Sequence, residues 1–176
     1  MASSITDNDH STMEQSLYWK ELFQLKVHSH YIELFLKKSE THDRCINMIL
    51  AISSTASIGA WAIWNNYAMV WGLIIAGSQV IQAIRPYLPY NELLKCAAGL
   101  RNSYSELFVF ADTKWPSIAS GELSKAEIAS LREQLRAKKL QYEQKAFPSS
   151  GFPDNEKFIE KATQKAELYF ANFYGD

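Results

Sequence analysis

The side chains that could support chemistry are few, and the histidines are the first to consider. His28 and His30 are separated by a single residue. Imidazole is a common metal ligand, but residues two apart on a helix point to different faces. We therefore predict that this pair lies on an exposed helix surface and that the chain holds no metal.

The sequence contains no Gly-rich phosphate loop and no HExxH, GxSxG or CxxC motif. Its carboxylates are scattered among basic neighbours, which is typical of a solvated helix surface. We predict that the protein is not an enzyme, that it has no catalytic residues and that it uses no cofactor. The 18 basic and 19 acidic residues give a net charge of -1, which disfavours direct binding of nucleic acid.

Four uncharged polar residues in an apolar segment are the main candidate functional residues. Ser54 and Ser57 form one pair, and Gln79 and Gln82 form the other. Each pair has the three-residue spacing that places side chains on one face of a helix. Hydroxyls and amides in such a segment can hydrogen-bond between packed helices, or they can line a water-filled path in an oligomer. Packing is the commoner role, and the residues alone leave both alternatives open.

These residues lie in the segment Cys45–Ile84, which contains no Asp, Glu, Lys, Arg or His. A bilayer core about 30 Å thick takes about 20 apolar residues per helix, and Asn65-Asn66 divides the segment into two halves. The sequence therefore predicts two transmembrane helices joined by a tight turn. Aromatic residues that favour a membrane interface cluster near this turn, namely Trp61, Trp64, Tyr67 and Trp71. The alternative is a hairpin buried inside a soluble all-α domain.

The rest of the chain is predicted to be helical. Residues 1–16 are expected to form a disordered leader without the features of a signal peptide, and residues 17–44 an amphipathic helix that continues into the first span. Basic residues flank the hairpin at Lys37, Lys38, Arg44 and Arg85, so both termini are predicted to be cytoplasmic. The predicted fold is thus an all-α membrane protein: a transmembrane hairpin over 45–84, with a cytoplasmic, coiled-coil-like bundle that includes residues 85–176.

Three helices are expected after the hairpin, beyond a bend at Pro86 and Pro89. The first carries a heptad seam and should end near Trp115-Pro116; the seam is Leu93, Ala97, Leu100, Tyr104, Leu107 and Ala111. The second should begin with a capping box at Ser124 and Glu127 and end near Ala146. The third should have Asp154 as its N-cap, stop at Gly175, and carry the seam Ile159, Ala162, Ala166, Tyr169 and Phe173.

The layout, with the segments YNELLKCAAGLRNSYSELFVFAD, SGELSKAEIASLREQLRAKKLQYEQ and KATQKAELYF, resembles the SLATT domains of bacterial conflict systems. The resemblance covers roughly Leu17 to Tyr174. It implies an antiphage effector in the bacterial inner membrane that forms a pore when a partner detects infection. The partner would be a nucleotide synthase, a SLOG-type sensor or a reverse transcriptase. The chain departs from the family in having no dense basic cluster before the first span.

The sequence leaves three hypotheses. The first is a pore-forming effector that contacts membrane lipid, forms a homo-oligomer and is triggered by a partner, causing growth arrest or cell death. The second is a membrane-anchored adaptor whose helical region docks a soluble partner without conducting ions. The third is a soluble helical subunit whose hairpin is buried by a partner.

Overall fold

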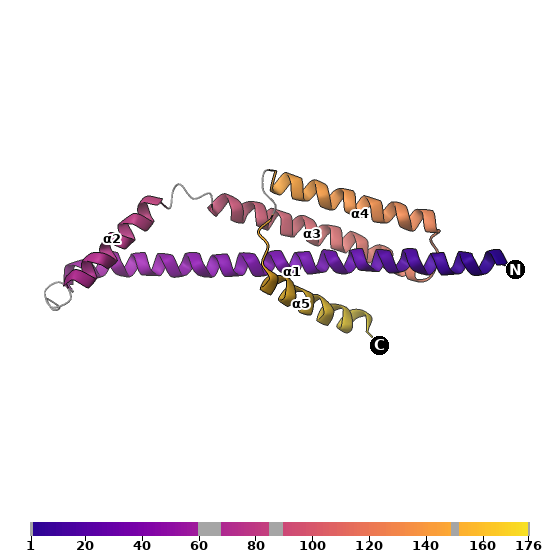
Figure 1. The fold of residues 1–176 in the computed structure, drawn as a ribbon, viewed down its shortest axis with the longest axis horizontal. Helices are drawn as coiled ribbons and strands as arrows, with labels where there is room; N and C mark the ends of the chain where they lie inside the picture. The colour runs from indigo at the N-terminus through magenta and orange to yellow at the C-terminus, as the bar shows by residue number, and fades with distance from the viewer. Residues whose placement is uncertain (1, 60–67, 85–89, 149–151, 176) are drawn as a thin grey trace. The chain divides into compact units, whose positions relative to one another are not determined.

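The computed structural model describes residues 2–59, 68–84, 90–148 and 152–175. Within these residues the chain forms five helices and no strand: α1 (Ala2–Gly59), α2 (Ala68–Ile84), α3 (Tyr90–Ala119), α4 (Lys125–Ala146) and α5 (Glu156–Tyr174) (Figure 1). The all-α part of the predicted fold class is confirmed. Of the helices in the described part of the chain, none is both long enough and apolar enough to cross a membrane.

The helices form two compact units. Unit 1 comprises residues 1–35 and 96–176, and unit 2 comprises Leu36–Lys95. Helix α1 contributes its first part to unit 1 and its later part to unit 2. The two units are described separately below.

The core of unit 1 follows the seam predicted for α3. Ala97, Leu100, Tyr104, Leu107 and Ala111 are all buried. They are joined in the core by apolar residues of α1, namely Tyr18, Leu22, Leu25 and Ile32. From Ala97 to Ala111 the heptad seam of α3 is therefore buried within the chain, an outcome that periodicity alone left open, whereas Leu93 at its start is only half-buried.

Helix α1 begins at Ala2, well before the start expected near Leu17. Tertiary contacts account for order in part of the segment that was predicted to be a leader. The Gln15 amide donates a hydrogen bond to the Ile118 carbonyl oxygen at 2.8 Å. Glu14 forms an ion pair with Arg132 of α4, with 2.9 Å between carboxylate oxygen and guanidinium nitrogen. These partners are more than 100 residues away along the chain, so a reading of the local sequence does not detect them.

The ends of the later helices follow local signals, with two exceptions. The Ser124 hydroxyl accepts from the Glu127 amide and the Glu127 carboxylate accepts from the Ser124 amide, which confirms the capping box. The C-cap at Gly175 is also confirmed. The prediction of Asp154 as N-cap is wrong, because the neighbouring side chain, Asn155, accepts from the Phe158 amide.

The second exception is α3, which continues through Pro116 to Ala119 instead of ending there. The missing proline N–H costs one hydrogen bond near the end of the helix, and the following turn is closed by the Ser120 amide, which donates to the Pro116 carbonyl oxygen at 2.9 Å. Gly121 then adopts a φ of 75°, the left-handed conformation common just past a helix end.

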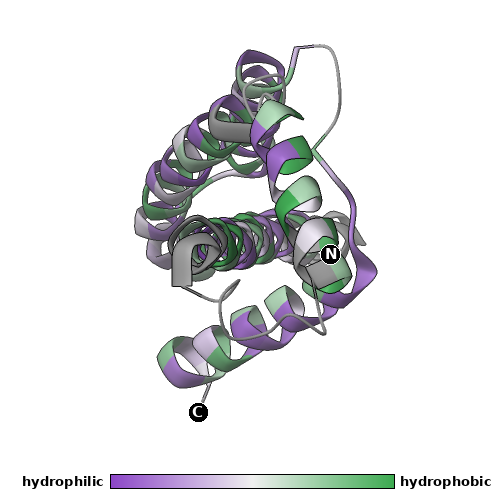
Figure 2. Ribbon diagram, turned by 90° about the vertical axis from the view of Figure 1, so that its left-hand side faces the viewer, coloured by the Kyte–Doolittle hydropathy of each residue, from purple (hydrophilic) through white to green (hydrophobic). Residues whose placement is uncertain are grey.

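Helix α5 is amphipathic, and Figure 2 shows both hydrophilic and hydrophobic residues along it. Ala162 and Ala166 are buried as predicted, but the next buried residue is Phe170, whereas Phe173 is exposed. Ile159 is exposed as well. A straight helix drifts about 20° per heptad relative to a strict seven-residue repeat. The contact surface of α5 has therefore moved away from the predicted seam at both ends.

Unit 2 contains the later part of α1 together with α2, and it buries few side chains. Leu50 and Ser78 are buried, and the Ser78 hydroxyl donates to the Ile75 carbonyl oxygen at 2.8 Å. Every other side chain of α2 that the structure describes is exposed. The predicted turn at Asn65-Asn66 and the predicted bend at Pro86 and Pro89 lie outside the described residues.

Candidate functional site

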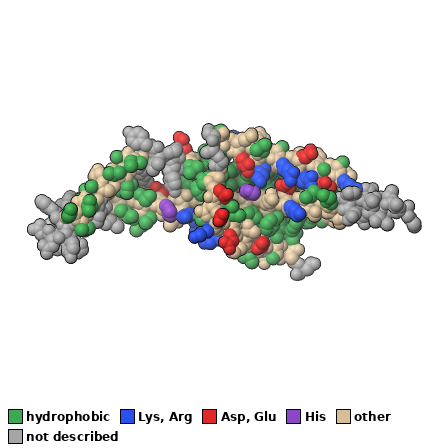
Figure 3. Space-filling model, in the orientation of Figure 1, with side chains coloured by type: hydrophobic (Ala, Val, Ile, Leu, Met, Phe, Trp, Pro, Cys, Tyr) green, Lys and Arg blue, Asp and Glu red, His purple; other side chains and the backbone are tan. Residues whose placement is uncertain are grey.

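The first candidate site is an exposed apolar surface on unit 2, which we call the hairpin surface. It arises because residues 45–84 carry no charged side chain, while α2 packs only a small part of its circumference. Hydrophobic side chains gather over this region in Figure 3. The large apolar residues exposed here are Ile46, Met48, Ile49, Met69, Val70, Leu73, Ile75, Val80, Ile81 and Ile84.

The extent of exposure distinguishes this surface from ordinary scattered surface residues. Met69 is 83% exposed and Leu73 is 68% exposed, each at a position without a charged neighbour in sequence. Single exposed apolar residues are normal on folded proteins, whereas many exposed apolar residues in one uncharged region are typical of interaction sites. The hairpin surface is therefore suited to contact with another apolar phase.

The two predicted glutamines are both exposed on α2. Gln79 follows Gly72 by seven residues and Ala76 by three, so it lies on their side of the helix. Gln82 follows Gln79 by three residues, the spacing that places both amides on one side of the helix. Their role in helix contact or in lining a water path stays a prediction.

Against the described residues, the two glycines of α2 make no close helix packing. A Cβ atom added at Gly72 or at Gly77 would meet no atom within 4 Å. The backbone is therefore accessible at both glycines, as far as the described residues show. Small residues permit close approach of a neighbouring helix, and the described residues leave both positions open to such a contact.

The remaining predicted site residues are not placed in the same detail. Ser54 and Ser57 lie near the end of α1, and Trp71 lies in α2. The structure describes the backbone of these three residues but not their side chains. Trp61, Trp64 and Tyr67 lie outside the described residues altogether. Their predicted roles, as helix-contact or pore-lining residues and as interface anchors, stay predictions.

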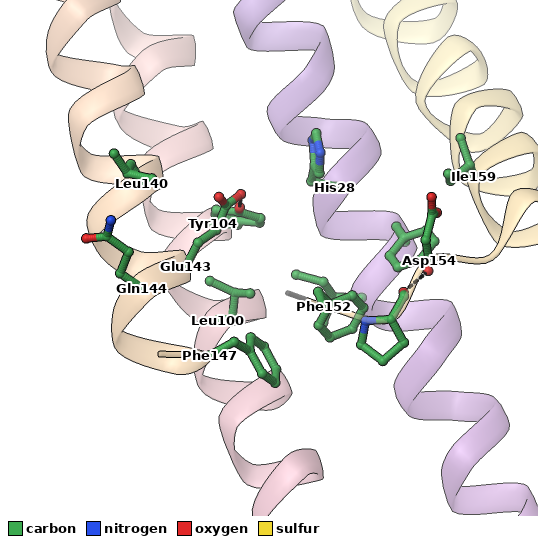
Figure 4. A pocket seen from close by; sticks show the side chains of 13 residues that line it. His28, Leu100, Tyr104, Leu140, Glu143, Gln144, Phe147, Phe152, Asp154 and Ile159 are labelled. Carbon is green, nitrogen blue, oxygen red and sulfur yellow. Dashed lines mark hydrogen bonds between the residues drawn. The ribbon is translucent and has the colours of Figure 1, made fainter. Parts of the chain in front are cut away.

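The second candidate site is a pocket of about 420 Å³ in unit 1 (Figure 4). Helices α1, α3 and α4 form its walls, and the segment that leads from α4 to α5 closes one side. Its lining residues are His28, Tyr31, Ile32, Leu100, Tyr104, Leu140, Glu143, Gln144, Phe147, Phe152, Pro153, Asp154 and Ile159.

Hydrogen bonds hold two tyrosines at the edges of the pocket. The Tyr104 hydroxyl donates to the Glu143 carboxylate, and this bond joins α3 to α4. The Tyr31 hydroxyl donates to the Pro153 carbonyl oxygen, and this bond joins α1 to the segment before α5. Burial and the neighbouring Glu143 carboxylate raise the pKa of Tyr104, so its hydroxyl stays protonated and remains a donor.

His28 faces the pocket from α1 as a neutral side chain. Burial lowers its pKa, and the positive charge of Lys139 lowers it further. The Nδ1 atom lies 2.7 Å from the Gln24 carbonyl oxygen, which can only accept, so Nδ1 is the protonated nitrogen. The ring lies 6.0 Å from the Tyr104 ring in an edge-to-face arrangement.

Phe152 is the centre of an aromatic wall on the opposite side of the pocket. Its ring lies 5.5 Å from that of Tyr31, 5.3 Å from that of Phe147 and 4.9 Å from that of Phe35, each close to edge-to-face. Such pairs add to the stabilisation from burial. They fix the course of the chain on either side of residues 149–151.

The structure corrects the environment predicted for the histidine pair. Both imidazoles are half-buried and not exposed. His30 lies 3.2 Å from the Glu33 carboxylate, whereas His28 faces the pocket, so the two rings do have different surroundings as expected. Among the described residues there is no group of three or more His, Cys, Asp or Glu side chains arranged to hold a metal.

The pocket residues were missed by reasoning from the sequence. Glu143 and Gln144 were read as part of a charged helix surface, and Phe147 and Phe152 as parts of a helix end and a loop. One feature of the sequence could have indicated the pocket. Two phenylalanines flank a short loop that contains Pro and Gly, and large apolar side chains are uncommon in a connection that lies fully on the surface.

Comparison of the chain with protein-family models, with curated proteins and with solved structures found no match.

Proposed function

We propose that this protein is a membrane effector that inserts its Cys45–Ile84 hairpin into a lipid bilayer, forms a homo-oligomer there and makes the membrane permeable. The observation that carries the proposal is the hairpin surface, the set of large apolar side chains that unit 2 leaves exposed. Burying apolar surface gains about 25 cal/mol per Å². A lipid bilayer offers that gain to all sides of the hairpin at once.

The organisation of unit 1 supports a position for it outside the bilayer. It buries its own seams and carries ion pairs between helices, such as Glu14 with Arg132 and Glu21 with Arg136. Its surface displays many charged residues, which are costly in hydrocarbon. We therefore assign insertion to unit 2 and regulation to unit 1, with both termini in the cytoplasm as the basic flanks predict.

Permeation needs several copies, because two helices cannot surround a water path. The side of α2 that carries Gly72, Ala76 and Gln79 fits this requirement, since its small residues permit close approach of a neighbouring helix. An amide at Gln79 could then face water without the cost of a buried charge. The resemblance to SLATT domains adds the biological setting, namely antiphage defence with a partner sensor as the trigger.

Membrane insertion is tested by fractionation of cells that express the full chain. The protein should stay in the membrane fraction after a carbonate wash. Ile75→Asp, within the hairpin surface, should reduce that retention, because Asp near the centre of a span costs about 2.5–3.5 kcal/mol. Val109→Asp is the matched control: Val109 is an exposed apolar residue of unit 1, and its variant should behave as the wild type. Release of the wild type into the soluble fraction would contradict the proposal.

Permeation is tested with a potential-sensitive dye in the same cells, with a membrane-fraction blot alongside. Depolarisation is expected for the wild type when the system is triggered. Gln79→Leu combined with Gln82→Leu should reduce it, with insertion unchanged, if both amides face water in the oligomer. A membrane-bound wild type that never depolarises the cell would instead favour the adaptor hypothesis.

A further inference from the structure

The pocket in unit 1 has a composition that selects a class of ligand. It is concave, its volume of about 420 Å³ lies within the usual range for small-molecule sites, and most of its lining is aliphatic or aromatic. Such sites are distinguished by the few polar groups that converge on them. Here those groups come from α1, α4 and the segment before α5.

The charged residues among the lining side chains are both acidic. Glu143 lies on α4 and Asp154 lies just before α5, while no lysine or arginine belongs to the lining. The one further titratable base there, His28, is held neutral by burial and by Lys139. A phosphate or carboxylate ligand would therefore meet two carboxylates in the lining, and the positive charge of Lys139, which acts on His28, lies outside the lining.

The acceptor on Glu143 is held in a defined position. Tyr104, which is 2% exposed, donates its hydroxyl proton to Oε1 of this carboxylate. The second oxygen, Oε2, has no donor among the described residues, so it can accept from a ligand. A carboxylate that is fixed in this way at the wall of an apolar pocket binds a cationic donor more strongly than a neutral one.

The aromatic residues of the pocket also favour a cationic ligand. Tyr31, Phe147 and Phe152 contribute rings to the pocket, and Figure 4 shows Phe147 and Phe152 directed toward the space between α1 and α4. The negative face of an aromatic ring attracts a cation, and its area accommodates an apolar or aromatic body. The carboxylate and the aromatic rings together suit a ligand that has a cationic group at one end and an apolar body at the other.

The geometry points to a binding site for a small organic ammonium ion with an aromatic or aliphatic body, seated between α1, α3 and α4. The ammonium group donates to Glu143, with Asp154 adding attraction from the opposite side, and the body packs against Phe147 and Phe152. The same two carboxylates disfavour nucleotides and other phosphorylated molecules in this pocket. The site lies entirely within unit 1, so it stands independently of any membrane role of the hairpin.

The test uses the purified full chain in mild detergent and three probes of similar size. These are phenethylammonium, the neutral phenethyl alcohol and the anionic 3-phenylpropanoate, each titrated by calorimetry and by chemical-shift changes. Phenethylammonium should bind with a dissociation constant of about 1 mM or below, as expected for a ligand of this size. The alcohol should bind at least several-fold more weakly, and neither propanoate nor adenosine monophosphate should compete.

Glu143→Gln removes the charge and replaces the Oε2 acceptor with an NH2 donor, while the amide oxygen can still accept from Tyr104. This variant should bind phenethylammonium roughly tenfold more weakly, the loss of one charge-assisted hydrogen bond, and bind the alcohol as before. Glu133→Gln, at an exposed carboxylate of the same helix, is the matched control and should leave both affinities unchanged. If Glu143→Gln does not fold, Asp154→Asn supplies the same comparison. Equal affinity for all three probes, or no binding of phenethylammonium, would overturn the inference.

Discussion

At the scale of single residues, the hydrogen bond from Tyr104 to Glu143 does most to define unit 1. It joins the buried seam of α3 to the half-exposed side of α4, and it places a carboxylate at the pocket wall. A buried hydroxyl needs such a partner, because an unpaired polar group in a core costs free energy. One bond thus serves both the packing of two helices and the character of the pocket.

Replacement of Tyr104 by Phe tests this role. Tyr104→Phe removes the donor while it keeps the ring, so the free energy of unfolding should fall by about 1–2 kcal/mol. Urea denaturation of the full chain in detergent measures the change. Tyr142→Phe, at a half-buried tyrosine of α4, is the control and should alter stability by less than about 0.5 kcal/mol. Equal effects of the two substitutions would show that the bond contributes little.

Histidine ionisation should make the stability of unit 1 depend on pH. Burial lowers the pKa of His28 and that of His30 from the ordinary 6.5. The unfolded chain therefore binds protons at a higher pH than the folded chain does, and stability should fall as the pH drops through about 6.5 toward the folded-state values. Above pH 7 both forms are neutral, and this contribution to the pH dependence vanishes.

The measurement is the unfolding free energy between pH 7.5 and 5 for the wild type and for His28→Gln. The variant should show a shallower decline over that window, because it removes one of the two sites. His42→Gln, at an exposed histidine of unit 2, should reproduce the wild-type slope. A slope that His28→Gln leaves unchanged would contradict this explanation.

At the scale of elements, helix ends and helix faces are set by different kinds of contact. The start of α4 depends on two reciprocal bonds between Ser124 and Glu127. The buried side of α5, in contrast, depends on Trp19 of α1, whose ring lies 4.9 Å from that of Phe170. The position of a cap is therefore local information, whereas the side that a helix buries depends on distant residues.

Loss of the Ser124 cap should be measurable at one end of α4. Ser124→Ala removes the acceptor for the Glu127 amide, and it should lower the free energy of unfolding by about 1 kcal/mol. Hydrogen exchange of amides in the first turn should quicken, and exchange near Ala146 should not change. Ser130→Ala, at an exposed position within the same helix, should be neutral or slightly stabilising. Uniform acceleration along α4 would argue against a local effect.

At the scale of the whole molecule, the two units differ in how much of their own apolar surface they bury. Unit 1 buries the seam of α3 together with one side of α1 and of α5, while unit 2 leaves most of α2 exposed. Folding of unit 1 therefore does not need a partner for its core. If the hairpin inserts into a membrane as proposed, lipid or further copies of the chain would cover these side chains.

Self-association is the expected consequence for the hairpin. Amine crosslinking of the protein in mild detergent should yield species larger than a dimer, because the proposed path requires several copies. Gly72→Leu should weaken these species, since a large side chain fills the space that close helix approach would use. Leu168→Ala, at an exposed apolar position of unit 1, serves as control. A protein that is monomeric in both the resting and the triggered state would contradict the oligomer.

Much of the helical framework could be predicted because its signals are local. The seam from Ala97 to Ala111 and the capping box at Ser124 each depend on spacings of three or four residues within one helix. The extent of α4 and the stop at Gly175 follow from the same short-range chemistry. The membrane role of residues 45–84 and the pore-lining role of Ser54, Ser57, Gln79 and Gln82 stay predictions.

The pocket and the burial pattern of α5 could not be predicted, because they arise from contacts between distant segments. Phe152 meets Tyr31 across more than 100 residues of chain, and Glu143 meets Tyr104 only because α4 packs against α3. The helical order before Leu17 likewise depends on Ile118 and Arg132. Local periodicity states which side of a helix is apolar; which distant residues it meets depends on the packing of the whole bundle.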